Sequence, residues 1–147
     1  MTSTIEGTLD HALFLARHMP RCNLQSAAVV VLIELGIPKH RLGHDYLKRA
    51  IVQFCKDPVQ AYSKGIYSEI AAVYGLDAND RSIEQAMRGA ISAAWKNRNE
   101  DVWKRYFRTD ADGKLKKPCN TEFVAGIACF LELVQGCYGG DDWYEEE

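Results

Sequence analysis

The chain has 147 residues, of which 47% are apolar and 26% are charged, and its formal net charge is −2. This length suits one domain that buries a core without disulfides or metal ions. The sequence has no apolar run long enough to span a membrane, and its N-terminus lacks the basic and apolar regions of a secretion signal. A membrane protein or a secreted protein is therefore not expected.

The cysteine content points to a reducing compartment. The chain has five cysteines, an odd number, and no two of them form a CxxC pair. They are Cys22, Cys55, Cys119, Cys129 and Cys137. A disulfide framework is not expected from such a set, and the cytoplasm is the expected location.

The charges are distributed unevenly along the chain. Residues 81–118 contain ten Lys or Arg and five Asp or Glu, a net of +5, whereas the remainder has a net of −7. Such asymmetry can give a basic face to a nearly neutral protein, as in nucleic-acid binding. The alternative is a set of ordinary solvated helix faces, and charge alone favours this alternative.

The first half of the chain predicts three helices. The first covers residues 8–19 and is ended by Pro20. The second runs from an Asn23 cap to Gly36 and is apolar nearly all round, which predicts the central buried helix. The third covers residues 41–57. Its predicted apolar stripe consists of Leu42, Tyr46, Ala50 and Phe54.

The second half continues as helices separated by short polar segments. The predicted helices cover residues 66–75, 81–97, 100–108 and 120–136. Asn79 or Asp80 is the expected cap of the 81–97 helix. The Asp-Gly pair at Gly113 favours a tight turn and therefore a hairpin tip in the polar segment before Pro118. No strand is recognisable, so the predicted fold class is all-α.

Motifs of enzymes are not found in the sequence, and neither enzyme activity nor a cofactor is expected. The chain has no HExxH, GxSxG, P-loop or glycine-rich dinucleotide turn. His40 and His44 are spaced i, i+4 and could share a metal ion on a helix. No third ligand lies at a motif spacing, so a structural role is favoured for both.

Residues 66–97 have the features of a helix-turn-helix. Ala71 and Gly75 are four residues apart, which allows two helices to approach and the chain then to turn sharply. The second helix has an inward stripe of Ile83, Ala86, Met87, Ala90 and Ala94, and an outward set of Arg81, Ser82, Gln85, Arg88 and Ser92. Arginine and glutamine can each bind a base edge with two hydrogen bonds in the major groove. Two ordinary helices of a bundle remain the alternative.

Four stretches carry a resemblance to a known family. They are LGIPKHRLGHDYLKRAI, YSEIAAVYG, IEQAMRGAISAAW and KPCNTEFVAGIA, in the family's order and near its spacing. Residues 24–134 resemble the C-terminal effector domain of the master regulator of endospore formation, stage zero sporulation protein A. The resemblance implies a six-helix bundle with a helix-turn-helix that binds short DNA boxes, often in tandem, and contacts sigma subunits of RNA polymerase. The 8–19 helix is then an addition.

The resemblance also implies which residues read bases. The family's second helix carries Ser-Arg-Val-Glu-Arg-Ala-Ile-Arg-His, which aligns with residues 81–89 here. Glu84 and Arg88 are kept, whereas Ser82 and Gln85 replace two base-reading arginines. The implied base-facing set is Arg81, Ser82, Glu84, Gln85 and Arg88. The replacements predict a DNA target that differs from the family's.

Phosphate contacts are implied by the same resemblance, because the family's Lys-Pro-x-Asn segment lies near the DNA backbone. The corresponding residues are Lys117 and Asn120. A solvated loop is the alternative for Lys117. Ser68, at the start of the first helix of the motif, is expected to offer a backbone amide to a phosphate.

The expected organisation is an N-terminal extension (1–22), an effector domain (23–136) and an acidic flexible tail (137–147). The extension is shorter than the phosphorylatable receiver domain of family members, so switching by aspartyl phosphorylation is not expected. The 8–19 helix could pack on the bundle, form a dimer or bind a partner.

Two functions remain as hypotheses. The first is a sequence-specific, DNA-binding regulator of transcription, with double-stranded DNA as its partner, a sigma subunit as a further candidate partner, and a homodimer on tandem sites. The alternative is a protein-interaction module of the same fold that binds sigma subunits or regulators without reading DNA. Ser82, Gln85 and Gly89, which replace larger family residues, and the negative net charge motivate the alternative. Steep salt dependence of binding would favour DNA.

Overall fold

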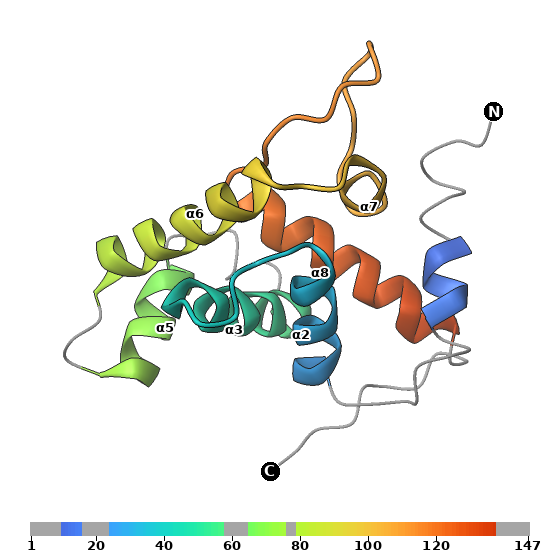
Figure 1. Ribbon diagram of the computed structural model, residues 1–147. Helices are drawn as coiled ribbons and strands as arrows, with labels where there is room; N and C mark the ends of the chain where they lie inside the picture. Colours follow the sequence, from blue (N-terminus) through green and yellow to red (C-terminus); the bar gives the residue numbers. More distant parts are fainter. Residues whose placement is uncertain (1–9, 16–23, 58–64, 76–78, 138–147) are drawn as a thin grey trace.

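The computed structural model describes residues 10–15, 24–57, 65–75 and 79–137, and over these residues the predicted all-α class is confirmed. The helices are α2 (Leu24–Glu34), α3 (Leu42–Lys56), α5 (Gly65–Tyr74), α6 (Asp80–Lys96), α7 (Glu100–Trp103) and α8 (Asn120–Cys137), and a short helix at residues 10–15 precedes them (Figure 1). Among the described helices, none is both long and apolar enough to cross a membrane.

The centre of the bundle is α3, which packs against α2, α5, α6 and α8. The sequence predicted α2 for this place, and that prediction is wrong. Val30 and Ile33 of α2 are 39% and 51% exposed, because only one side of this uniformly apolar helix meets its neighbours. Leu42, predicted in the buried stripe of α3, is 61% exposed because it is the first residue of the helix and lies at the edge of the packed region.

Helix α6 lies directly on α3 because Gly43 has no side chain. A Cβ atom added at Gly43 would lie 2.3 Å from the Ala86 carbonyl oxygen and 2.8 Å from the Ala90 Cβ atom. Both distances are far below van der Waals contact, so any larger residue would push the two backbones apart. This close contact fixes the position of α6 in the bundle.

The start and the inner face of α6 agree with the sequence. Asn79 is the cap: its side chain accepts a hydrogen bond from the Ser82 amide at 3.0 Å. The buried residues of the helix are Ile83, Met87, Ala90, Ile91 and Ala94. Four of these were predicted. Ala86 is half-buried, and Ile91 takes its place on the inner face.

The predicted hairpin tip is confirmed. The Asp110 amide donates to the Lys114 carbonyl at 2.8 Å, and an antiparallel bridge joins Thr109 to Leu115. Gly113 has a φ of 78°, a conformation that glycine adopts without strain. The hairpin is the orange loop of Figure 1 and connects α7 with α8.

The described part of the N-terminal helix packs on the bundle, which was the first of its three alternatives. Ala12 is fully buried, and His11 lies 3.0 Å from Glu34 at the end of α2. The remainder of the predicted 8–19 helix, Pro20, the Asn23 cap, and residues 138–147 of the predicted tail lie outside the described residues.

Candidate nucleic-acid interface

Helices α5 and α6 form a packed pair joined by residues 75–79. Gly75 has a φ of 88°, and its amide donates to the Ala71 carbonyl at 3.0 Å, so the chain leaves α5 in the left-handed conformation that glycine favours. Ile66 and Ile70, which share one face of α5, are buried. The helical spacing places Val73 on the same face, but it is 55% exposed because the last turn of α5 extends beyond its neighbours.

A side-chain hydrogen bond ties the start of α6 to α5. The Ser68 hydroxyl donates to an Asp80 carboxylate oxygen at 2.8 Å. Asp80 lies in the first turn of α6, where a negative charge is favourable because the helix amides point toward it. The sequence analysis named both residues but did not predict a bond between them, and the phosphate contact expected of the Ser68 amide stays a prediction.

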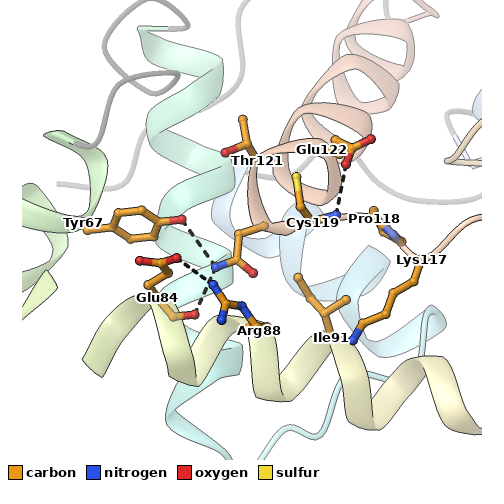
Figure 2. A pocket seen from close by; sticks show the side chains of 10 residues that line it. Tyr67, Glu84, Arg88, Ile91, Lys117, Pro118, Cys119, Thr121 and Glu122 are labelled. Atoms are coloured by element: carbon orange, nitrogen blue, oxygen red, sulfur yellow. Dashed lines mark hydrogen bonds and ion pairs between the residues drawn. The ribbon is translucent and has the colours of Figure 1, made fainter. Parts of the chain in front are cut away.

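The outward face of α6 carries the predicted base-facing residues. Arg81, Ser82, Gln85 and Arg88 are exposed, and Glu84 is half-buried. An Arg88 guanidinium nitrogen lies 2.7 Å from a Glu84 carboxylate oxygen, an i, i+4 ion pair (Figure 2). The two side chains remain 62% and 42% exposed, respectively, so water weakens the pair and a stronger partner can replace it.

Ser82 differs from its neighbours because its hydroxyl is already bonded to the backbone. The Ser82 Oγ atom accepts from the Asn79 amide at 3.0 Å and donates to the Asn79 carbonyl at 2.9 Å. Together with the bond from the Ser82 amide to the Asn79 side chain, this closes a capping box. The local role of Ser82 is therefore to start the helix.

A groove of about 480 Å³ lies between α6 and the first turn of α8 (Figure 2). Its lining combines two cations, two carboxylates and several neutral groups. The lining residues are Tyr67, Glu84, Arg88, Ile91, Lys117, Pro118, Cys119, Asn120, Thr121 and Glu122. Lys117 is drawn toward α6, where its ammonium group donates to the Ser92 hydroxyl. The groove thus borders the outward face of α6 directly.

Asn120 reaches into this region from the first residue of α8. It is 7% exposed, and its amide nitrogen donates to the Glu84 carbonyl at 3.0 Å and, at a longer 3.4 Å, to the Tyr67 hydroxyl. The sequence gave no sign of Tyr67, because its partner lies 53 positions away. The structure does not test the phosphate contact expected of Asn120, whose side chain lies behind the surface.

The first turn of α8 carries its own carboxylate. The Cys119 amide donates to a Glu122 carboxylate oxygen at 3.2 Å. Hydrogen bonds from Cys119 lower the pKa of Glu122, so the groove keeps a negative charge at this end. Anionic ligands are therefore favoured toward Arg88 and Lys117 rather than toward the helix terminus.

Metal binding finds no support in the described part of the chain, where no group of three or more His, Cys, Asp or Glu residues could hold an ion. His40 precedes α3, so it and His44 do not share a helix as the i, i+4 spacing had suggested. His44 is 3% exposed, and burial lowers its pKa, which describes a neutral core histidine.

The candidate interface lies inside a region of the chain that matches a known protein family. The family model described as "Sporulation initiation factor Spo0A C terminal" matches residues 29–131, which is well over half of the chain. The chain belongs to the Spo0A C-terminal family. This family consists of DNA-binding effector domains of a sporulation regulator. The match contains α5, α6 and the groove, so the candidate interface lies entirely within the Spo0A-like part.

Proposed function

We propose that this protein is a sequence-specific DNA-binding regulator of transcription and that α6 enters the major groove. One observation carries the proposal. A helix held against α3 by a direct backbone contact presents Arg81, Gln85 and Arg88 outward, within a family of DNA-binding domains. An exposed helix of this kind has the dimensions that a major groove admits.

Base recognition is assigned to four side chains of the outward face. Arg88 binds a guanine edge with two hydrogen bonds, and Glu84 orients the guanidinium or accepts from a cytosine. Gln85 suits an adenine edge, and Arg81 lies near the helix start, where base contacts are common in this motif. Ser82 contributes chiefly the capping box, so the base contact expected of it is the weakest of the set.

Phosphate binding is assigned to Lys117 and to the backbone amide of Ser68. Lys117 lies beside the outward face of α6, at Ser92, and can reach a phosphate of a duplex seated there. The start of α5 offers backbone amides. Such contacts add affinity and salt dependence without choosing a sequence. A homodimer on tandem sites and a sigma subunit as a protein partner belong to the same proposal.

The second candidate is a protein-interaction module that binds sigma subunits or regulators. The ion pair between Arg88 and Glu84 favours it, because the exposed Arg88 guanidinium is already bonded to a carboxylate. DNA binding remains preferred, since exposed pairs of this kind are weak and exchange easily.

The test is selection from a random duplex library at about 100–150 mM salt, with Arg88→Ala in parallel. We expect wild type to enrich one motif. The variant should lose about 1–3 kcal/mol of binding free energy at that motif, because one bidentate base contact is removed.

The matched control is Arg98→Ala. Arg98 follows the other end of α6, stacks on Trp95 at 3.7 Å and pairs with Glu100. Its loss should leave the enriched motif unchanged. A folded wild-type protein that enriches no motif, but binds a purified sigma subunit, would replace the DNA proposal with the interaction module.

A further inference from the structure

One buried side chain of α8 bonds to both helices of the α5–α6 pair. The Asn120 amide nitrogen lies 3.0 Å from the Glu84 carbonyl oxygen and 3.4 Å from the Tyr67 hydroxyl. Carbonyl oxygens only accept hydrogen bonds, so the nitrogen of the amide must face Glu84 and its orientation is determined. Asn120 therefore joins α8, α5 and α6 at one point.

This side chain does little for stability. The Asn120 Oδ1 atom is buried and has no hydrogen-bond partner among the described protein atoms. Leaving a buried acceptor unpaired costs about as much free energy as the hydrogen bonds of the nitrogen supply. An apolar residue would fill the same place without that cost, so stability does not explain why an asparagine lies here.

The position of the bond suggests another role. Glu84 and Arg88 leave α6 from the turn whose carbonyl Asn120 holds, and they form the 2.7 Å ion pair on the outward face. Bidentate recognition of a base tolerates only small displacements of the side chain that performs it. A turn that is held by a buried hydrogen bond keeps Glu84 and Arg88 in position when DNA competes with the Glu84 carboxylate for Arg88.

We propose that Asn120 is a positioning residue for base recognition, which fixes the turn carrying Glu84 and Arg88 and does not itself bind a phosphate. The inference rests on the DNA-binding function proposed above. At 7% exposure, with its donor directed to α6, Asn120 lies behind the surface that a duplex would meet. Lys117, three residues earlier, reaches that surface instead.

The experiment compares Asn120→Ala with Lys117→Ala, and uses Thr121→Ala as the control that lines the same groove. Affinities are measured for the duplex that wild type enriches and for a scrambled duplex, each over a salt series. We expect Asn120→Ala to weaken binding to the enriched duplex roughly tenfold, the equivalent of one hydrogen bond. Its affinity for the scrambled duplex and its salt slope should not change, because no phosphate contact is lost.

Lys117→Ala should behave differently, with equal losses on both duplexes and a salt slope that is shallower by about one. If Asn120→Ala shows this second pattern, Asn120 is a phosphate contact and the proposal fails. It also fails if Asn120→Ala binds both duplexes like wild type.

A second variant and a DNA-free measurement keep the inference separate from the proposed function. Asn120→Leu keeps the branched shape of the side chain and adds no charge, so the fold is retained while the donor to Glu84 is lost. In either variant, amide hydrogen exchange in free protein should be about tenfold faster at residues 84–88 than in wild type. Unchanged exchange there overturns the positioning role, whereas wild type that enriches no duplex overturns the DNA-binding function and leaves the exchange result as evidence only that Asn120 holds the turn.

Discussion

Two polar clusters, one around Glu34 and one formed by Glu84 and Arg88, contain similar residues in different surroundings. Near the N-terminal helix, the Glu34 carboxylate accepts hydrogen bonds from Tyr106 at 2.8 Å and Arg105 at 3.1 Å, and lies 3.0 Å from His11. These partners come from distant parts of the chain, and Glu34 is 21% exposed. On α6 the corresponding pair is local, four residues apart and far more exposed. The first cluster joins elements, whereas the second is available for exchange.

The electrostatics of the two clusters show the same contrast. Burial alone would raise the pKa of Glu34, but hydrogen bonds from His11, Tyr106 and Arg105 outweigh burial and lower the pKa overall. Burial and the nearby Glu34 charge raise the pKa of Tyr106, which therefore remains a donor. The partly buried charge of Glu34 is stabilised by several hydrogen-bond donors together. The charge of Glu84 on α6 has one exposed partner, Arg88, which another group can replace.

The largest effect is expected from a substitution that disrupts the close contact between Gly43 of α3 and the backbone of α6. Gly43→Ala forces a methyl group against the Ala86 carbonyl, so unfolding should become easier by about 2–3 kcal/mol, as in overpacked cores. Gly89→Ala is the matched control, because a Cβ atom there meets nothing within 4 Å. It should stabilise the helix by about 0.5–1 kcal/mol. Urea unfolding checks both, and equal signs for the two variants would contradict the packing argument.

A smaller effect is expected from Glu34→Gln, which removes the charge of the partly buried cluster around Glu34. The free energy of unfolding should fall by about 1–2 kcal/mol at neutral pH, since hydrogen bonds to a charged group are lost. The folded-state pKa of Glu34 is lowered, so its contribution is present above its ordinary value of 4.5 and is lost as pH falls through the folded value. Thermal unfolding from pH 7 to 3 should show wild type and variant converging in acid.

Glu100→Gln is the control for that series, because its pair with Arg98 is on the surface and 47% of its side chain is exposed. The control should follow wild type at every pH to within a few tenths of a kcal/mol. A constant gap between wild type and Glu34→Gln down to pH 3 would rule out ionisation as the cause.

The smallest effect is expected from removing the cap at the start of α6, compared with removing the cap of α7. Asn79→Ala removes the cap of α6 and should cost about 1 kcal/mol of stability, together with some DNA affinity as the first turn frays. Asn99→Ala removes the equivalent cap of α7, where the Asn99 side chain accepts from the Asp101 and Val102 amides. It should cost similar stability without loss of DNA affinity. Equal DNA losses would show that only general stability matters.

Much of the fold could be predicted because the chain marks its own helix ends. Gly75 and Asn79 adopt the conformations that their chemistry favours, and the inner face of α6 follows its apolar spacing. The degree of burial of α2 could not be predicted, because uniform apolarity does not say how many neighbours surround a helix. The exposure of Val73 could not be predicted for a related reason. Spacing assigns a residue to one face of a helix, but only the packed bundle shows where the buried part of that face ends.

Part of the candidate site could likewise be predicted from the sequence, and part of it could not. The outward residues Arg81, Gln85 and Arg88 follow from helical periodicity and the family resemblance, and they lie on one exposed face. The orientation of Asn120 could not follow from either, because its partner Glu84 is 36 positions away and the bond exists only after folding. Periodicity places residues on a surface, whereas hydrogen bonds between distant residues need the three-dimensional structure.

The contact between Gly43 and the α6 backbone also affects how such proteins diversify. Because α6 is held by that contact, by its inner stripe and by hydrogen bonds from Ser68 and Asn120, exchanges at Gln85 or Arg81 leave folding almost untouched. Duplicated genes could therefore accumulate changes on the outer face and acquire new operators while the scaffold stays constant. Gly43 itself should tolerate no drift, so one invariant glycine beside a variable helix face is the expected signature in a lineage of these proteins.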